Sequence, residues 1–373
     1  MEETKNLCKR WKIGAIACFS GAGVILVTFA LIVFLSITGR IEHIKLNEAN
    51  LGINSSLIPQ ESLDKMKGYT NVAIFGLDNR MQGIYSSGNS DVIIIVSIDN
   101  ETKAVKLVSV YRDTLLNIGD DLGGLTKCNA AYNRGGPEAA VAMLNSNLDL
   151  DIKDFVAVDW NAVTEVIDEL DGIELEIDAS EINYINFYID EINDKLGRRS
   201  SHVTKAGKQN LDGVQATAYC RIRYTAGGDF RRAMRHRIVL ETMLEKAKTK
   251  DIATLLSIVN EMADDISTSF ELNEMIALAM DVDKYTIAET SGFPFKLTSE
   301  LIYCGSTDIP LGLAENVSKL HSFLFLDDNY QPSAVVKNIG AEITRVTGYD
   351  ANSHTDYNMD EFNNTTGKDN AFK

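Results

Sequence analysis

Residues 71–78 (NVAIFGLD) and 91–99 (DVIIIVSID) decide the fold, because both are short and rich in β-branched side chains. The second run is almost continuously apolar, which is typical of a strand buried on both faces. A third run, AVKLVSV, follows at residues 104–110. Together these runs predict strands of a buried central sheet.

Helical patterns alternate with strand-like segments further along the chain. Residues 137–148 (PEAAVAMLNSNL) begin with a proline suited to a first turn, and residues 161–170 (NAVTEVIDEL) follow the strand-like DFVAVDW of residues 154–160. A longer amphipathic pattern covers residues 230–248, and Asp229 is expected to cap this helix. The alternation predicts an α/β fold, a three-layer α-β-α sandwich around a central mixed sheet.

The N-terminal region predicts a membrane anchor. Residues 13–39 carry no charged side chain, and about 20 apolar residues suffice to cross a bilayer. Basic residues at 5, 9, 10 and 12 predict that residues 1–12 are cytoplasmic and the rest extracytoplasmic. A cleaved signal peptide is the alternative. We expect a juxtamembrane linker at residues 40–69, a catalytic domain at 70–335, and a C-terminal extension at 336–373 that is disordered at its end.

Composition narrows the function classes. The formal net charge of -17 makes the chain a poor nucleic-acid binder, and five scattered histidines do not favour a zinc enzyme. The exported cysteines Cys128, Cys220 and Cys304 are too widely spaced for a disulfide framework or a metal motif. Buried small side chains are their expected role, and whether Cys128 and Cys220 form a disulfide stays open.

A cluster of arginines stands out against the acidic background. Residues 220–237 read CRIRYTAGGDFRRAMRHR. Like charges repel unless an anion lies among them, and guanidinium groups bind phosphate oxygens two at a time. A Gly-Gly turn allows one arginine set to fold back on the other, so the stretch predicts a phosphate or pyrophosphate cradle near a helix N-terminus. Its expected members are Arg221 and Arg223 in an extended segment and Arg232, Arg235 and His236 on one helix face, whereas Arg231 and Arg237 are expected to pair with acids at the surface.

Charged residues also follow the predicted strands. Asp78 and Asp91 would suit Mg²⁺, which prefers one or two carboxylates together with phosphate oxygens; capping of turns is the alternative role. Asp113, followed by Thr114, is expected to be a structural turn pair. Lys127 is either a further phosphate donor or a solvated loop lysine.

Several separated motifs, in this order, resemble the LytR-CpsA-Psr family of membrane-anchored cell-envelope glycopolymer transferases. The resemblance covers about residues 71–248, and a segment from Leu320 (LHSFLFLDDNYQPS) is also similar. The motifs are GLDNR, SDVIIIVSID, SVYRDT, KCNAAYNRGGPEAA, DFVAVDW and LDGVQATAYCRIRYTAGGDFRRAMRHR.

The resemblance implies a transfer reaction at the outer membrane face. Family members move a glycan from a polyprenyl pyrophosphate to a peptidoglycan sugar hydroxyl through a phosphodiester. The implied metal ligands for Mg²⁺ (or Mn²⁺) are Asp78 and Asp91. The implied catalytic residues are Arg112, Arg221, Arg223 and Asp229. The implied pyrophosphate-binding residues are Arg80, Arg112, Lys127, Arg221, Arg223, Arg232, Arg235 and His236.

Three positions depart from the family pattern: Tyr111 replaces a common proline, Arg231 a glycine and His236 a glutamine. His236 is expected to donate a hydrogen bond and to titrate near neutral pH. Two other functions stay open, a polyprenyl-pyrophosphate hydrolase and a non-catalytic membrane-tethered receptor or regulator. The glycan also stays open among wall teichoic acid, capsule and other wall polymers.

Overall fold

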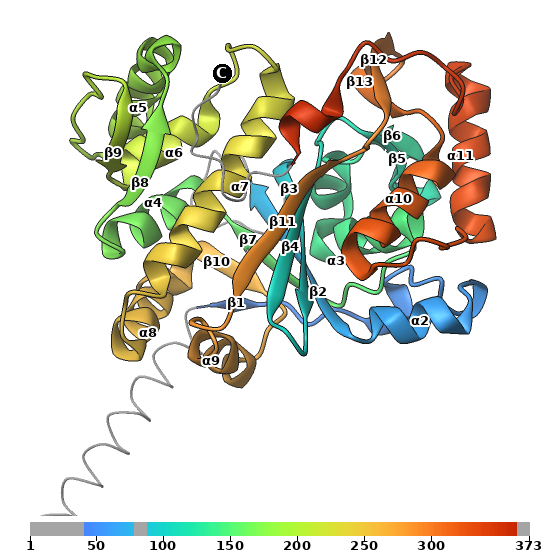
Figure 1. Ribbon diagram of the computed structural model, residues 1–373, viewed down its shortest axis with the longest axis horizontal. Helices are drawn as coiled ribbons and strands as arrows, with labels where there is room; N and C mark the ends of the chain where they lie inside the picture. Colours follow the sequence, from blue (N-terminus) through green and yellow to red (C-terminus); the bar gives the residue numbers. More distant parts are fainter. Residues whose placement is uncertain (1–40, 78–87, 364–373) are drawn as a thin grey trace, which may run out of the picture.

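The structure, a computed structural model, describes residues 41–77 and 88–363. A mixed sheet lies at its centre, with the strand order β1-β10-β7-β2-β3-β4-β11 (Figure 1). The strands of this sheet are β1 (Glu42–His43), β2 (Tyr69–Leu77), β3 (Ser90–Asp99), β4 (Ala104–Val110), β7 (Asp154–Val158), β10 (Ile266–Thr268) and β11 (Thr286–Phe293).

The three apolar runs predicted as strands form β2, β3 and β4, and they pair antiparallel with one another. β7 and β11 pair parallel with β2 and β4 respectively, which makes the sheet mixed. The run of isoleucines in β3 alternates between the two faces. Ile93 and Ile95 join the larger core cluster, whereas Ile94 packs in a second cluster with Leu107. Burial on both faces explains why the run is almost continuously apolar.

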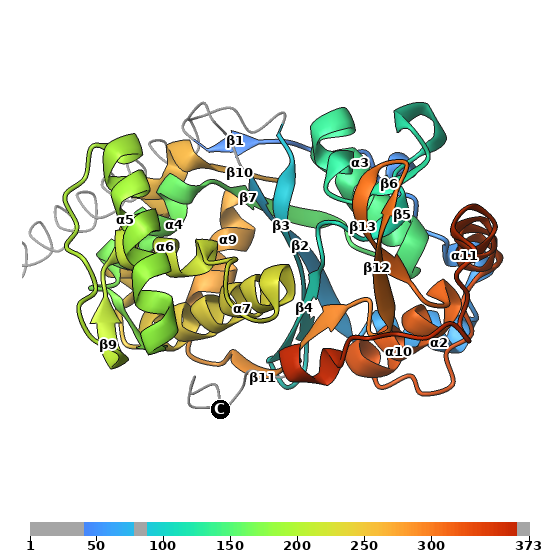
Figure 2. The same ribbon diagram turned by 90° about the horizontal axis from the view of Figure 1, so that it is seen from above.

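Helices cover both faces of the sheet, as Figure 2 shows, so the predicted α/β sandwich with a mixed central sheet is confirmed. On one side lie α2 (Gln60–Met66), α3 (Ala130–Leu148), α10 (Leu313–Phe325) and α11 (Ala334–Thr347). On the other lie α4 (Trp160–Glu169), α5 (Ile182–Leu196), α6 (Gly213–Arg221) and α7 (Gly228–Ala247). Further helices are α8 (Ile252–Glu261) and α9 (Leu272–Met280).

Three two-stranded sheets complete the described strands. They are β5 (Leu115–Asn117) with β6 (Leu125–Lys127), β8 (Ile173–Ile177) with β9 (Gly207–Leu211), and β12 (Leu297–Ile302) with β13 (Gly305–Pro310). Short 3₁₀ helices are η1 (Glu48–Asn50), η2 (Ser55–Leu57), η3 (Asp120–Leu122), η4 (Ala179–Glu181), η5 (Met262–Asp265) and η6 (Met359–Phe362).

Pro137 lies inside α3 and not at its first residue. Gly136, directly before it, has a non-helical backbone (φ 68°, ψ -166°) and kinks the helix. A proline removes one backbone donor, which is tolerated where a helical segment starts afresh. Pro137 therefore begins the second part of α3, as the sequence predicted for this segment.

Two predicted boundaries are wrong. Residues 41–69, expected as a linker, belong to the domain, because β1 pairs with β10 and Leu51 is fully buried. Residues 336–363, expected as an extension, also belong to it, because Val336 and Phe362 are buried. The predicted disorder can therefore apply only to residues 364–373, which lie outside the described part of the chain.

The predicted membrane span at residues 13–39 also lies outside the described residues and stays a prediction. Within residues 41–77 and 88–363, no helix has the length and apolar character needed to cross a bilayer.

Candidate active site

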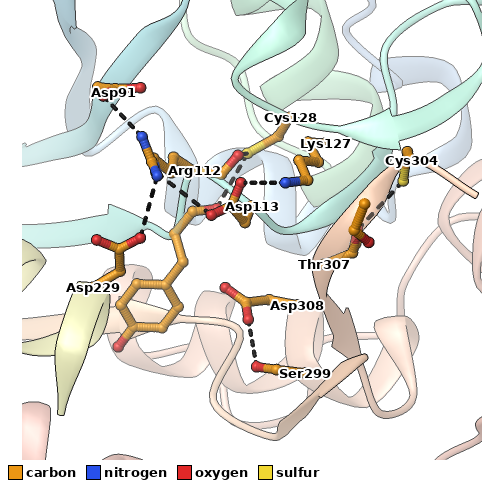
Figure 3. A network of polar contacts seen from close by, with 12 residues as sticks. Asp91, Arg112, Asp113, Lys127, Cys128, Asp229, Ser299, Cys304, Thr307 and Asp308 are labelled. Atoms are coloured by element: carbon orange, nitrogen blue, oxygen red, sulfur yellow. Dashed lines mark hydrogen bonds and ion pairs between the residues drawn. The ribbon is translucent and has the colours of Figure 1, made fainter. Parts of the chain in front are cut away.

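Arg112, the second residue after β4, lies at the centre of a charged network beside the sheet (Figure 3). Its Nη1 donates to Oδ2 of Asp91 at 2.8 Å, and its Nη2 lies 3.4 Å from Oδ2 of Asp229. Nε lies 3.5 Å from Oδ2 of Asp113. Burial by itself lowers the pKa of Arg112, but the three carboxylates outweigh it and raise the pKa above its ordinary value. Arg112 is therefore a permanent positive charge.

Arg223 and Arg232 converge on the same carboxylates. Nη2 of Arg223 lies 3.3 Å from Oδ2 of Asp91, and its Nε lies 3.7 Å from Oδ1 of Asp229. Nη1 of Arg232 lies 3.3 Å from that same Oδ1, and its Nη2 donates to the carbonyl oxygen of Asp91 at 3.4 Å. The Gly-Gly turn thus brings one arginine set to the other, as the sequence predicted.

Asp229 is not the N-cap of α7, contrary to the prediction. The helix begins at Gly228, its N-cap is Gly227 in the left-handed region (φ 86°), and no side chain caps it. Asp229 lies in the first turn, where its negative charge is favourable at the positive end of the helix dipole. Its carboxylate is directed at Arg112, Arg223 and Arg232.

Arg221 reaches the site from another element. It is the last residue of α6, so Arg221 and Arg223 are separated by the helix end and do not share one extended segment as predicted. Its guanidinium lies over the rings of Trp160 and Tyr188, and Nη2 donates to Oε1 of Glu191 at 2.8 Å. Stacking on two rings holds this charge in place.

Arg221, Arg223 and Arg232 line a cavity of about 210 Å³, here called the cationic cavity, whereas Arg112 and Asp229 do not line it. Its lining residues are Asp91, Val92, Trp160, Tyr188, Arg221, Arg223, Arg232 and His236. Burial lowers the pKa of Arg232 to about 10, so Arg232 stays charged at neutral pH. The cavity is therefore suited to an anion.

An apolar cavity of about 180 Å³ adjoins it. Val92, Trp160 and His236 line both cavities. The apolar cavity runs between the sheet and α4 and α7, and its other lining residues are Ile74, Gly76, Leu77, Ile94, Val156, Val158, Asp159, Val163, Val166, Cys220, Val239, Leu240 and Met243. A space of this composition is suited to a hydrocarbon chain.

His236 lies where the two cavities meet, but it does not titrate near neutral pH as expected. Burial, followed by the charge of Arg232, lowers its pKa to about 3. Its Nε2 lies 3.0 Å from the carbonyl oxygen of Cys220, which can only accept, so Nε2 carries the proton. His236 is therefore neutral and uses its Nε2 proton within the fold.

Arg235 does not belong to the site, contrary to the prediction. Its guanidinium is fully buried and donates to Oε1 of Glu181 at 2.6 and 3.1 Å. It also donates to the carbonyl of Ile222 and to Oγ1 of Thr225. Arg235 therefore stabilises the start of the loop that carries Arg223.

The prediction that Arg237 pairs with an acid at the surface is also wrong, because its side chain is fully buried. One of its nitrogens donates to the carbonyl oxygen of Phe362. Arg231, for which the same surface role was predicted as for Arg237, is partly buried.

Lys127 is linked to Arg112 through the carboxylate of Asp113. Its Nζ lies 3.0 Å from Oδ1 of Asp113, and Asp113 bridges the two cations. Asp113 is therefore part of the charged network and not only a turn residue. Lys127 does not line the cationic cavity.

Asp308 of β13 was not found by the sequence analysis. It lines a small cavity together with Asp91, Arg112 and Asp229, and it accepts a hydrogen bond from Oγ of Ser299 at 2.6 Å. Burial raises the pKa of Asp308 to about 6, and the nearby Asp113 and Asp229 add to this. No motif marks Asp308. It is brought to the site by backbone pairing with a distant segment, because its N–H donates to the carbonyl of Asp113 and it forms a β-bridge with Thr114.

Of the two predicted metal ligands, the structure describes only Asp91. Asp78, like Arg80, lies outside the described residues. Asp91 is present, but its Oδ2 is paired with Arg112 and Arg223. No group of three side chains suited to a metal occurs in the described part of the chain.

Cys128 and Cys220, whose pairing the sequence did not decide, are free thiols, and both are buried. Burial raises the pKa of both thiols well above the ordinary value. They serve as small buried side chains, as predicted.

Residues 37–305 match the model of the LytR_cpsA_psr family, and the chain belongs to this family.

Two curated relatives illustrate the family. The chain is 30% identical to polyisoprenyl-teichoic acid--peptidoglycan teichoic acid transferase TagV of Bacillus subtilis (strain 168), over 69% of this chain and 62% of that protein. It is 28% identical to the transferase TagU of Enterococcus faecalis (strain ATCC 700802 / V583), over 56% of this chain and 64% of that protein. The matches thus span less than two thirds of the length of these relatives.

A solved structure of the family shares the fold. It is described as the LytR-CPS2A-psr family protein YwtF (TagT) with bound octaprenyl pyrophosphate lipid. The TM-score is 0.53 at 18% identity, and the match covers 76% of this chain and 99% of that one.

Proposed function

We propose that this protein is a membrane-anchored phosphotransferase that moves a glycopolymer from a polyprenyl-pyrophosphate carrier to peptidoglycan through a phosphodiester bond. The observation that carries the proposal is the junction of the apolar and cationic cavities at Val92, Trp160 and His236. A polyprenyl pyrophosphate has the same order of parts, a hydrocarbon joined directly to two phosphates. The names of TagV and TagU support the reaction class.

The chemistry needs charge stabilisation more than covalent help from the protein. An acceptor hydroxyl oxygen attacks the phosphorus that carries the glycan, and a new P–O bond forms. The bond from that phosphorus to the bridging oxygen breaks, and polyprenyl phosphate leaves with this oxygen. Arg221, Arg223 and Arg232 line the space where the phosphates would lie, and fixed guanidinium groups stabilise the charge that develops there.

Asp229 is the proposed acceptor of the hydroxyl proton. Its Oδ1 is buried and has no hydrogen-bond partner among the described residues, although Arg232 lies 3.3 Å away. We propose that this oxygen, which faces Arg223 and Arg232, takes the proton as the attack proceeds. Its Oδ2 meanwhile faces Arg112 and keeps that side chain oriented.

A divalent cation, Mg²⁺ or Mn²⁺, is a further part of the proposal. Asp91 would hold it together with Asp78 and the oxygens of the pyrophosphate, since Mg²⁺ is commonly held by one or two carboxylates and substrate phosphates. The one described ligand, paired with two arginines, does not by itself make a metal site. When bound, the cation would supply additional neutralisation of the phosphate charge.

The proposed location is the outer face of the cell membrane. The apolar residues 13–39 would anchor the chain with residues 1–12 in the cytoplasm, and the net charge of -17 opposes a nucleic-acid partner. A polyprenyl carrier lies in the membrane, so a tethered domain meets both this lipid and the wall.

The test uses the full chain in detergent with Mg²⁺, a short-chain polyprenyl-pyrophosphate disaccharide and peptidoglycan oligosaccharides. Mass spectrometry should show a glycan-phosphate adduct on the acceptor together with polyprenyl phosphate, and both should disappear in Arg221→Ala. Cleavage of the lipid without an adduct would instead indicate a hydrolase. Binding of the lipid without cleavage would indicate a receptor.

A further inference from the structure

The C-terminal segment, residues 349–363, lies beyond the region that matches the family model, yet it packs beside α7, whose first turn carries Asp229. Oγ1 of Thr355 donates to the carbonyl of Leu297 at 2.5 Å, which ties the segment to β12. Oδ1 of Asn363 accepts hydrogen bonds from the backbone N–H of Gly292 and from Oγ of Ser291, which ties its end to β11. Its final turn, η6, lies beside α7, as the red ribbon in Figures 1 and 2 shows.

Phe362 packs directly against Gly227, the N-cap of α7. A Cβ atom on Gly227 would lie 2.6 Å from Cε1 of Phe362, so only glycine allows this approach. Gly227 also has a positive φ of 86°, which disfavours any other residue. Phe362 therefore packs against the start of the helix whose first turn carries Asp229.

Phe230 links this contact to Arg112. Its ring is 5.8 Å from that of Phe362, 5.3 Å from that of Tyr357 and 4.7 Å from that of Tyr111, measured between centroids. Phe230 directly follows Asp229, and Tyr111 directly precedes Arg112. The ring contacts, edge-to-face or tilted, therefore join the C-terminal segment to the residues next to Asp229 and Arg112 in the chain.

Arg237 anchors the segment through its backbone. Its guanidinium is fully buried and donates to the carbonyl of Phe362, while Nε and Nη1 have no hydrogen-bond partner among the described residues. A buried guanidinium is costly unless its donors are satisfied. The Phe362 carbonyl is thus a specific partner, and removing it would leave the charge less well satisfied.

We propose that the C-terminal segment is a positioning element of the active site, with Phe362 as the positioning residue that keeps Asp229 against Arg112. Neither Phe362 nor Tyr357 lines the cationic or the apolar cavity, so neither is expected to touch the substrate. The inference rests on the proposed function only for its kinetic readout.

The experiment compares Phe362→Ala with the unchanged full chain in detergent. Displacing reacting groups slightly lowers the rate of the chemical step more than substrate binding. We expect kcat for transfer to fall at least about tenfold, with KM for the lipid donor within about twofold. Amide hydrogen exchange of residues 227–232 should become faster. Phe362→Leu, which keeps an apolar side chain, should recover part of kcat.

The matched control is Phe270→Ala. Phe270 is as buried as Phe362 (8% and 7% exposed) but lies outside all three cavities described above. This variant should lower the melting temperature without changing kcat when both proteins are folded. A normal kcat in Phe362→Ala, or unchanged exchange of residues 227–232, would overturn the proposal.

If Phe362→Ala does not fold, Tyr357→Ala tests the positioning role of the C-terminal segment. Tyr357 is 37% exposed, so its removal should cost little stability and still lower kcat and speed up exchange of residues 227–232. Wild-type values for both would overturn the proposal. If the unchanged chain shows no transfer at all, the proposed function fails, and the exchange measurement still tests the positioning role on its own.

Discussion

Arg223 and Asp91 are 132 residues apart in the chain, yet Nη2 of Arg223 lies 3.3 Å from Oδ2 of Asp91. The same oxygen accepts from Arg112, so one carboxylate orients cations from two distant segments. This relationship connects the end of the sheet to the loop before α7. It preorganises positive charge before a phosphate arrives, which is how electrostatic catalysis lowers a barrier.

Arg223→Ala should impair the reaction without unfolding the protein. Arg223 has 39% of its side chain exposed, so its loss costs little packing, but it removes one donor from the phosphate site. We expect kcat to fall about a hundredfold, the usual effect of losing one such donor. Arg345→Ala, on the exposed face of α11, is the control and should leave kcat unchanged. A kcat within twofold of wild type for Arg223→Ala would contradict its role.

Arg235→Ala should act through stability. It would leave Glu181, which is 1% exposed, as a buried carboxylate without its cation. Breaking a buried pair in this way typically costs about 3–5 kcal/mol. Urea unfolding should show this loss, and the double variant Arg235→Met with Glu181→Leu should recover much of it. If Arg235→Ala kept its stability but bound the lipid donor more weakly, Arg235 would belong to the substrate site after all.

His236 should make the protein acid-sensitive. Its folded pKa of about 3 lies below the ordinary value of 6.5, so between these values the unfolded chain binds the extra proton. Stability is therefore fully present above pH 6.5 and falls as pH drops, by about 1.4 kcal/mol per pH unit from this group. Urea unfolding at pH 7 and pH 5 should show a smaller difference in His236→Gln. An equal difference in both proteins would show that His236 titrates normally.

Asp308 should have the opposite pH dependence. Its folded pKa of about 6 is above the ordinary 3.8, so the folded state binds the extra proton between these values and loses stability as pH rises through them. Asp308→Asn keeps an acceptor for Ser299 but carries no charge. At pH 7.5 this variant should be more stable than wild type, by roughly 3 kcal/mol. Lower stability of the variant at pH 7.5, relative to wild type, would contradict the raised pKa.

Val163→Phe should block the apolar cavity. Val163 lines this cavity from α4 and does not line the cationic cavity. A larger ring there should weaken binding of a long polyprenyl donor about tenfold or more, whereas inorganic pyrophosphate should bind as before. Val346→Phe on α11, where the side chain is 38% exposed, is the control. Equal affinity for the long donor in Val163→Phe would show that the lipid lies elsewhere.

The strands could be predicted because their signal is local. The apolar run of residues 91–99 is continuous only if both faces are buried, and Ile93 and Ile94 do pack on opposite sides. The convergence of Arg223 and Arg232 could be predicted from the Gly-Gly turn between them. In each case the residues that determine the feature lie within a short stretch of chain.

Arg235 could not be assigned from spacing. Residues three apart on a helix differ by roughly 60° in direction, and long side chains at these positions can reach different partners. The partner of Arg235 is Glu181, 54 residues earlier, and no local pattern places it there. Arg237 and Asp308 likewise depend on distant segments.

The C-terminal segment was predicted as disordered because its composition is polar. Three apolar side chains, Tyr357, Met359 and Phe362, are nevertheless spaced within it, and Met359 and Phe362 are buried against α7 and its neighbours. The average polarity of the segment conceals these few apolar side chains. Their effect depends on a complementary surface, here Gly227 and Phe230, that only the folded domain provides.

Oxygen tracing tests the central claim most directly. The full chain, the lipid donor and peptidoglycan oligosaccharides are incubated in H₂¹⁸O. The ¹⁸O content of the phosphorylated products is then measured by mass spectrometry. Transfer predicts a glycan-phosphate adduct and polyprenyl phosphate that both lack ¹⁸O, because the attacking oxygen comes from the sugar and the bridging oxygen leaves with the lipid. Absence of the adduct, with ¹⁸O in either phosphate product, would show hydrolysis and contradict the account.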